Sequence, residues 1–493
     1  MTLLALPGVA ALVSAARCVE GSAADWRRWG LPRAGLTWPK KRRLVQRAAQ
    51  ACDAARRMRR QRRLLRALFG RAWPSAARQF ARRADPLAPP PAPSTFPPLA
   101  ASEHFRFEVL HASSKPGSRA RVGRLHTPHG VVDTPGFVPV GTNGALKAVA
   151  LADADDVGMQ LMFCNTYHLL LQPGPAPVEA AGGLHAFVGR PRGPLITDSG
   201  GFQIFSLQYG GVEEELKRAA PRRGAGAAER EPGGKARPSG VLRVSEEGVL
   251  FRSYRDGARV LLTPESSVAA QKSFGADIIL PLDELPPYHI TPALLAASVA
   301  RSHRWEARSL AAHLADPRRQ AMYGILHGGT DAALRAASAD YLCALPFDGF
   351  AIGGALGRDR PEMLAMLSVL MPLLRAGAPV HLLGVGDEES LVACAPLGID
   401  TFDSAFPTRL GRHGTLLTSS GRVTLRKAEH AAAFRPPDEA CGCATCRTHS
   451  LAYLHHLWRA REPVLASLAA VHNIAHTLRV AARLRSDILA DRV

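Results

Sequence analysis

The chain has 493 residues, enough for one large catalytic domain with an extension, and its 62 Lys and Arg outnumber its 42 Asp and Glu to give a formal net charge of +20. Residues 1–100 contain 20 of the basic residues and only four acidic ones, a net +16, which leaves residues 101–493 at +4. The overall charge therefore says little about what the main body of the chain binds.

Residues 1–100 form a basic extension rich in Arg and Ala, which ends in a proline-rich linker at residues 86–98. This composition predicts a disordered or weakly helical segment that targets the protein to an organelle, a plastid or a mitochondrion. Two alternatives remain: a retained arm in which residues 56–66 form a cationic helix for RNA phosphates, or an error in the gene model. The apolar run at residues 3–13 is too short to span a membrane and no later run is long enough, so we expect a soluble protein.

Eight short apolar runs follow, and each is succeeded by a segment able to form a helix. Such near-continuous apolar runs are typical of buried parallel strands, and eight of them predict an α/β fold of the (β/α)₈ barrel type over residues 105–430. A doubly wound open sheet is the alternative. A polar, Gly/Pro-rich segment at residues 217–240 predicts a flexible surface insertion. The runs lie at residues 137–140, 160–164, 194–197, 277–282, 322–326, 349–352, 381–385 and 399–402.

Polar residues gather where these predicted strands end, which is where barrel enzymes carry their active sites. Three of them are aspartates: Asp198 in TDSGGFQ, Asp283 in PLDE and Asp403 in TFDSAFPTR. A single aspartate at such a place is often only a helix cap. Three converging carboxylates without a phosphate-binding loop instead favour chemistry at a glycosidic carbon, in which one carboxylate attacks and another moves protons.

Three of the eight cysteines, Cys441, Cys443 and Cys446, lie within six residues. Thiolates at this spacing can hold one Zn²⁺ when a fourth ligand completes the tetrahedron, so residues 431–493 are expected to form a zinc-binding subdomain with helices that close the barrel. Spacing alone does not choose the fourth ligand among the downstream histidines His449, His455, His456, His472 and His476.

Over residues 105–483 the chain resembles the tRNA-guanine transglycosylase family, also called queuine tRNA-ribosyltransferase. The shared motifs occur in the family's order. They are VDTPGFVPVGT, CNTYHLLLQPG, TDSGGFQIFSL, FAIGG, GVGD, GIDTFDSAFPTR, CGCATC and SLAYLHH. The resemblance implies a (β/α)₈ barrel with an embedded zinc subdomain, and exchange of guanine at the wobble position of tRNAs with a G-U-N anticodon (Asp, Asn, His and Tyr). It also implies a homodimer, or a heterodimer with a related subunit.

The resemblance also implies roles for individual residues. Asp403 would attack the ribose and form a covalent intermediate, and Asp198 would act as general acid and base. Asp283, His327 and the loop at residues 353–355 would read the base. Two arginines would hold the RNA, and the family's spacing would make His472 the fourth zinc ligand. The loop consists of Gly353, Gly354 and Ala355, and the two arginines that would hold the RNA are Arg409 and Arg412.

Three departures from the family pattern concern the base. His327 replaces a glutamine, Leu285 stands where many bacterial members have a cysteine, and Gly357 matches queuine-using relatives where bacterial enzymes tend to have a bulkier residue. We therefore expect queuine as the substrate, with its smaller aminomethyl-deazaguanine precursor as the alternative.

Three other functions remain open at this stage. A non-catalytic accessory subunit would not need the three aspartates that this chain keeps. An RNA-binding zinc protein would depend on the basic extension, so guanine exchange by a chain lacking residues 1–100 would exclude it. A sugar hydrolase would need an aromatic sugar platform, and Phe, Trp and Tyr make up only 6% of the chain.

Overall fold

The computed structural model describes residues 85–209 and 240–493, which belong to one compact unit. The predicted targeting segment up to residue 84 and nearly all of the predicted insertion at residues 217–240 lie outside the described residues.

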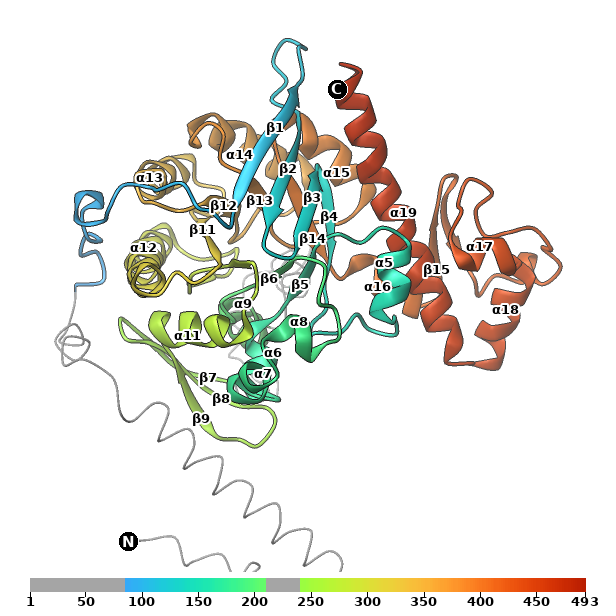
Figure 1. The fold of residues 1–493 in the computed structure, drawn as a ribbon, viewed down its shortest axis with the longest axis horizontal. Coiled ribbons are helices and arrows are strands. Elements are labelled where there is room, and N and C mark those ends of the chain that lie inside the picture. Colours follow the sequence, from blue (N-terminus) through green and yellow to red (C-terminus); the bar gives the residue numbers. More distant parts are fainter. Residues whose placement is uncertain (1–84, 210–239) are drawn as a thin grey trace, which may run out of the picture. The chain divides into compact units, whose positions relative to one another are not determined.

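Eight parallel strands form the central sheet (Figure 1). A parallel bridge between Val140 and Phe163 joins the first strand of this sheet to the last and closes it. Each of the eight predicted apolar runs overlaps one of these strands, so the barrel prediction is confirmed and the open sheet is excluded. In sheet order the strands are β4 (Gly136–Pro139), β14 (Thr401–Ser404), β13 (Val380–Leu382), β12 (Gly349–Ile352), β11 (Ala321–Leu326), β10 (Ile278–Ile279), β6 (Leu195–Thr197) and β5 (Met162–Cys164).

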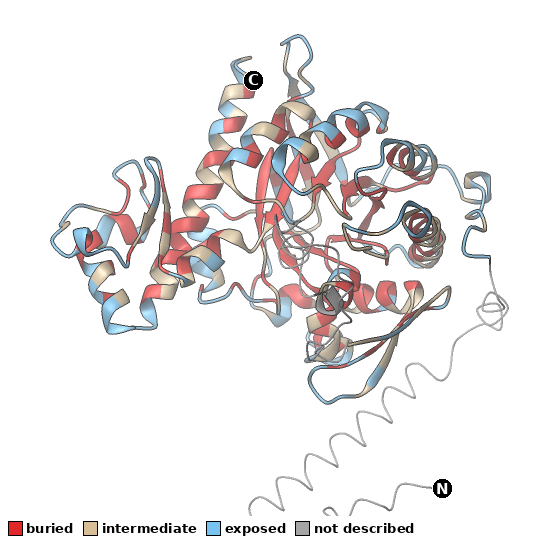
Figure 2. Ribbon diagram, turned by 180° about the vertical axis from the view of Figure 1, so that it is seen from behind, coloured by how far each residue is buried: buried red, intermediate tan, exposed pale blue. Residues whose placement is uncertain are grey.

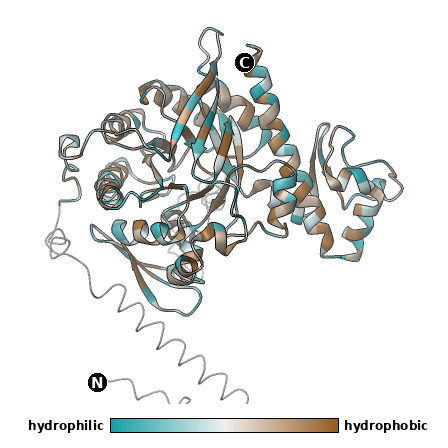
Figure 3. Cartoon of the chain, in the orientation of Figure 1, coloured by the Kyte–Doolittle hydropathy of each residue, from teal (hydrophilic) through white to brown (hydrophobic). Residues whose placement is uncertain are grey.

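The strands are mostly apolar because both of their faces are covered. One set of side chains, including Phe163, Ile196 and Tyr323, fills the interior of the barrel. The opposite set, including Met322 and Phe350, packs under the surrounding helices. Figures 2 and 3 show the result as a buried, hydrophobic centre with polar residues on the outer faces of the helices.

The surrounding helices follow the strands along the chain. Asp331, Asp359 and Asp387 begin three of them, since each side chain accepts a backbone N–H of the first turn. The helices are α5 (Leu151–Asp156), α6 (Thr166–Leu171), α7 (Pro175–Ala180), α8 (Leu184–Phe187), α9 (Gly201–Tyr209), α11 (Pro264–Phe274), α12 (Pro292–Ala315), α13 (Ala332–Cys343), α14 (Arg360–Leu370), α15 (Glu388–Cys394), α16 (Phe406–Arg412) and α19 (Val464–Leu489), with the 3₁₀ turns η1 (Pro93–Thr95), η2 (Met371–Leu373), η3 (Ala395–Leu397) and η4 (Ala428–His430).

Three small antiparallel sheets extend the barrel. The C-terminal one packs with two helices around a core of leucines, and in Figure 1 this subdomain lies across α19 from the barrel. The sheets are β1 (Arg106–Ala112), β2 (Arg121–Thr127) and β3 (Gly130–Thr134); β7 (Val241–Ser245), β8 (Gly248–Arg252) and β9 (Arg259–Leu262); and β15 (Thr415–Thr418) with β16 (Gly421–Thr424), which packs with α17 (Ala444–Thr448) and α18 (Leu451–Ala460).

Helix α19 is the one described helix long and apolar enough to cross a membrane by length and composition alone. However, 67% of its apolar window is buried inside the protein. Its residues Ala470, Ile474 and Val480 belong to the same hydrophobic cluster as the outer faces of the strands. The helix therefore has the burial of a core helix.

The described part of the proline-rich linker packs against the barrel. Phe96 contacts the outer hydrophobic core, and the carbonyl of Pro91 accepts a hydrogen bond from the hydroxyl of Tyr341 on α13. The linker is thus held in place from residue 85 onward.

Carboxylates at the amino ends of the strands hold neighbouring strands together. Asp277, Asp348 and Asp400 each stand directly before a strand and accept the N–H of a residue at the start of an adjacent strand. The distances from the backbone nitrogen to the carboxylate oxygen are 2.8 Å for Leu195, 2.8 Å for Met322 and 2.7 Å for Val380, respectively. These aspartates are structural, because the carboxyl ends of the strands lie at the opposite end of the barrel.

Asp277 has two further partners. Its Oδ1 lies 2.7 Å from Nδ1 of His129 and its Oδ2 lies 3.1 Å from Nε2 of His185, and the two imidazole rings stack at 3.5 Å. Burial alone would raise the pKa of Asp277, but the hydrogen bonds from the two histidines outweigh it and lower this pKa to about 2.

Replacing Asp277 with Asn should lower the free energy of unfolding by about 2 kcal/mol at pH 7. Because the pKa of the carboxyl is lower in the folded chain, its contribution is present above about pH 4 and is lost as the pH falls toward 2. Denaturant unfolding at several pH values measures this difference. The exposed Asp316, which pairs with Arg318 on the surface, gives the control Asp316→Asn with an expected effect below about 0.5 kcal/mol. An Asp277→Asn protein as stable as wild type at pH 7 would contradict the assignment.

Candidate active site

Asp403 lies in β14, near the carboxyl end of the strand, and its side chain is only 9% exposed. Its Oδ1 accepts two hydrogen bonds, from the backbone N–H of Gly384 at 2.9 Å and from Nε2 of His381 at 3.1 Å. The other ring nitrogen of His381 accepts from the hydroxyl of Thr401 at 2.8 Å, which keeps the proton on Nε2. Among the described residues, Oδ2 of Asp403 has no such donor, so this oxygen is left for a reaction partner.

Asp198 follows β6 and is buried. Burial raises its pKa to about 6, although four donors oppose this shift. The donors are the side chains of Asn165 (2.6 Å) and Gln203 (2.8 Å) and the backbone N–H groups of Thr166 (2.7 Å) and Gly200 (3.1 Å). A carboxyl group with a pKa near neutrality can both give and take a proton, as a general acid and base must.

Asp283 stands near Asp198 and next to the predicted base-reading histidine. The hydroxyl of Ser199 lies 3.4 Å from Oδ1 of Asp283, and Oδ2 lies 3.2 Å from Nε2 of His327. Asp283 is 8% exposed and His327 only 2%. The structure thus brings both predicted residues together at the ends of β10 and β11.

The loop at residues 353–355 follows β12 and is anchored by a buried arginine. The guanidinium of Arg335 donates to the carbonyls of Gly353 (3.0 Å) and Ala355 (3.2 Å). It also donates to Leu326 and Gly329, the residues that flank the turn after β11. Burial lowers the pKa of Arg335 to about 9, and its hydrogen bonds all go to backbone carbonyls. Arg335 therefore fixes the path of two neighbouring loops at the rim.

Contacts inside the barrel connect Asp403 to Asp198. The ring of His381, which holds Asp403, stacks on Phe163 of β5 at 6.0 Å. Two residues after Phe163 comes Asn165, which holds Asp198. The three predicted aspartates are therefore positioned by adjoining elements at the same end of the barrel.

Gly357 lies two residues beyond the loop at residues 353–355. Its φ is +121°, a conformation that residues with a side chain disfavour. A Cβ atom there would come within 3.0 Å of the backbone nitrogen of Met363 and 3.1 Å of Glu362 on α14. A larger residue at 357 would therefore force this loop onto another path.

Leu285 packs against the cluster that contains Trp305 and Leu282.

Arg409 and Arg412 lie on α16, the helix that directly follows Asp403. Arg409 is exposed, and Arg412 is half-buried with its side chain bonded to the carbonyl of Thr408. Both thus belong to the element next to the proposed nucleophile.

The sequence did not identify His381, Asn165, Gln203 or Arg335 as positioning residues. Three of the four lie inside a predicted strand or helix, where nothing in the pattern separates a polar side chain with a partner from one that faces solvent. Phe202 was also missed. It is exposed at the start of α9, four residues after Asp198, and offers a flat apolar surface there.

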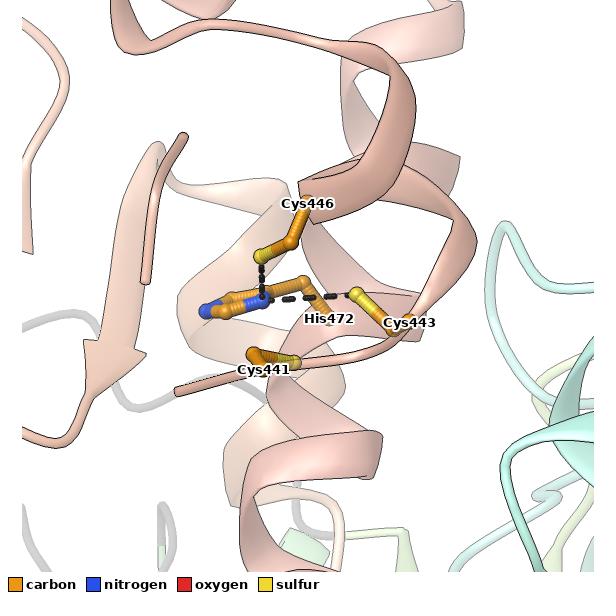
Figure 4. Close-up of side chains that lie close together, drawn as sticks. All are labelled: Cys441, Cys443, Cys446 and His472. Atoms are coloured by element: carbon orange, nitrogen blue, oxygen red, sulfur yellow. Dashed lines mark hydrogen bonds between the residues drawn. The ribbon is translucent and has the colours of Figure 1, made fainter. Parts of the chain in front are cut away.

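Cys441, Cys443, Cys446 and His472 form a buried group whose ligand atoms all lie within 4.8 Å of one another (Figure 4). Nδ1 of His472 faces the thiols, at 3.2 Å from Sγ of Cys446 and 3.6 Å from Sγ of Cys443. Its Nε2 donates to the carbonyl of Leu417 at 2.8 Å, which fixes the ring in the orientation that a metal ligand needs. Hydrogen bonds from the neighbouring thiols hold the pKa of Cys441 below its usual range. This group could hold a metal ion.

A closed (β/α)₈ barrel with three carboxylates at one rim and a separate Cys₃His group is the architecture of a barrel enzyme with a subdomain that could hold a metal ion. The family model described as queuine tRNA-ribosyltransferase matches residues 115–222 and 233–493. The chain is 53% identical over 390 residues to the queuine tRNA-ribosyltransferase of Protochlamydia amoebophila, which covers 79% of this chain and 97% of that protein. It is 48% identical to the enzyme of that name from Chlamydia abortus, over 79% of this chain and all of the relative.

The chain belongs to the queuine tRNA-ribosyltransferase family, and it is a tRNA-guanine transglycosylase, a pentosyltransferase. The resemblance inferred from the motifs is therefore confirmed. The basic N-terminal segment lies before the first residue that the family model matches.

Replacing Cys443 with Ala removes one of the four ligand atoms, so the protein should lose its bound metal and unfold at a lower temperature. Metal analysis by mass spectrometry and a thermal melt measure the two effects. The matched control is Cys343→Ala, since this half-buried thiol lies outside the group. A Cys443→Ala protein that still holds one equivalent of metal would contradict the assignment.

Proposed function

We propose that this protein replaces guanine at the wobble position of tRNAs with a G-U-N anticodon (Asp, Asn, His and Tyr) by queuine, through a covalent intermediate on Asp403. The observation that carries this proposal is the state of the Asp403 carboxylate. His381 and Gly384 hold Oδ1, and Oδ2 is left to attack the anomeric carbon of the ribose.

The proton transfers are assigned to Asp198. When guanine leaves, it needs a proton, and when the new base attacks the intermediate, it must lose one. A carboxyl with a pKa of about 6 can do both near neutral pH. Its four donors keep the group in one orientation while its charge changes.

We call Asp283, His327 and residues 353–355 the base site. Asp283 supplies acceptor oxygens for the N–H groups of a guanine-like ring, and His327 a ring nitrogen at the end of the neighbouring strand. Arg409 and Arg412, on the helix after the nucleophile, would contact RNA phosphates.

Two observations support queuine as the incoming base. The two relatives described above are both called queuine tRNA-ribosyltransferase. In addition, Gly357 allows a loop path that a bulkier residue would exclude. The alternative is the same reaction with the aminomethyl-deazaguanine precursor. A non-catalytic accessory subunit is disfavoured, because all three aspartates and their supporting contacts are present.

The ion of the Cys₃His group is proposed to be Zn²⁺, because three thiolates and one imidazole nitrogen are the ligand set of closed structural zinc sites. It would stabilise the C-terminal subdomain and take no part in the reaction.

Replacing Asp403 with Asn should abolish the covalent RNA adduct and slow guanine exchange by a factor on the order of 10³ or more, because the amide has the same shape but is no nucleophile. Incubation with radiolabelled tRNA followed by denaturing electrophoresis detects the adduct. Asp400→Asn is the control: Asp400 lies in the same segment but bonds Arg121 at the other end of the barrel, so this variant should lose stability and keep the adduct. An adduct that persists in Asp403→Asn would overturn the proposal.

The choice of base is tested by steady-state kinetics with the two free bases. We expect kcat/KM for queuine to exceed that for the aminomethyl precursor by about tenfold or more. Incorporation of the precursor alone would show that the loop at Gly357 does not select queuine.

A further inference from the structure

A buried glutamate stands behind the base site. Glu306 lies on α12, is fully buried, and was not singled out by the sequence. Its Oε2 accepts the backbone N–H of Ile325 in β11 at 3.0 Å. Strand β10 pairs with β11 only as far as Met322, so Glu306 takes the place of a strand partner for Ile325. One oxygen of this carboxyl therefore has a structural task.

The second oxygen of Glu306 points at the base site. Oε1 lies 3.8 Å from Nε2 of His327, and neither atom has a hydrogen-bond partner among the described residues, although both are buried. Oδ2 of Asp283 is closer to the same Nε2, at 3.2 Å, but it does not form a hydrogen bond with it. Two carboxyl groups thus compete for one ring nitrogen. Buried polar atoms without partners are rare and call for an explanation.

We propose that Glu306 is a positioning residue of the base site, which acts through His327 and decides which ring nitrogen of this histidine carries the proton. The proposal rests on the function proposed above, and it names a residue that determines how the base is recognised.

The proton of Glu306 makes this possible. Burial raises the pKa of Glu306 well above its ordinary value, and the nearby charge of Asp283 raises it further, while the N–H of Ile325 opposes the shift. Burial and the charge of Asp283 thus both favour the neutral form of this carboxyl. Since Oε2 serves as an acceptor for Ile325, the proposal places the proton on Oε1. Oε1 lies 3.8 Å from Nε2 of His327, so the two side chains must approach slightly for this proton to be donated.

The proton of the imidazole is then on Nδ1. This nitrogen faces the loop of the base site, because a Cβ atom on Gly354 would lie 3.4 Å from it. Guanine and its 7-deaza relatives present a carbonyl oxygen, which needs a donor. Without Glu306, the carboxylate of Asp283 would draw the imidazole proton to Nε2 and leave Nδ1 as an acceptor facing that oxygen.

This role explains why His327 needs a partner. The glutamine that the family usually has at this position carries a permanent donor on its amide, whereas a neutral histidine donates from only one of its two nitrogens. The other neighbours of His327 cannot determine which of its ring nitrogens carries the proton. Burial lowers the pKa of His303 to about 3, and its Nε2 bonds Ser338, whose hydroxyl oxygen also accepts the backbone N–H of His327.

The test uses four single variants, one double variant and one control, all measured by guanine exchange. Glu306→Met, similar in size but unable to donate, should raise KM for the free base by about tenfold and change kcat by less than about threefold. Glu306→Gln keeps an acceptor for Ile325 and turns an N–H toward Nε2, so KM should return to within about threefold of wild type. If Glu306→Met does not fold, Glu306→Asp withdraws the acid by one methylene and should move KM in the same direction.

The fourth variant separates a role through His327 from a purely structural one. In His327→Gln the donor no longer depends on Glu306, so adding Glu306→Met should raise KM no further. The control is Asp348→Leu, which removes a comparable strand contact at the other end of β11 and should lower stability without changing KM.

Additive effects of Glu306→Met and His327→Gln on KM, or an unchanged KM in both Glu306→Met and Glu306→Asp, would overturn the inference. A wild-type protein that forms no covalent adduct with tRNA would instead refute the proposed function, so the two failures are distinguishable.

Discussion

The site depends on the closure of the barrel. The bridge between Val140 and Phe163 joins the first and last strands, and through it residues that are more than 200 positions apart come to one rim. Phe163 is also the residue on which His381 stacks, so the closing strand contacts the side chain that holds Asp403. In an open sheet Phe163 and His381 would belong to strands well apart from each other. The carboxylates of Asp198 and Asp403 could then not act on one nucleotide.

The barrel uses buried aspartates for two different purposes. At the amino ends of the strands, Asp277 and Asp400 have partners on both oxygens, and these contacts hold strands in place. At the carboxyl ends, Asp403 keeps one oxygen without a donor, and Asp198 has a pKa near neutrality. Asp403 thus differs from the structural aspartates by an oxygen that has no donor among the described residues. Asp198, whose oxygens both have donors, differs from them by a pKa that burial raises to about 6.

Much of the fold was predictable, because eight apolar runs separated by helical segments are typical of a (β/α)₈ barrel. The ends of the runs were less certain: β10 forms a ladder over only Ile278–Ile279, although the apolar run continues to Leu282. The three aspartates at the rim were singled out because each follows a predicted apolar run. The same pattern could not show that Asp277 and Asp400, which precede strands, are structural.

The supporting residues could not be predicted, since their roles depend on contacts between distant elements. Glu306, Arg335 and His381 lie within regular helices and strands, and only the folded chain shows that they meet the proposed base site or Asp403. In the Cys₃His group, spacing alone left five histidines possible, and the family's spacing pointed to His472. The folded chain places this histidine with the three thiols.

The central claim is that Oδ2 of Asp403 forms a temporary bond to an RNA ribose while Asp198 and Asp283 serve the base. The most direct measurement is to trap the wild-type protein on a G-U-N tRNA without free base, digest both polymers, and locate the linked peptide by tandem mass spectrometry. The account predicts an abasic ribose attached to the side chain of Asp403. A ribose attached to Asp198 or Asp283, or an intact guanosine in the linked fragment, would contradict it.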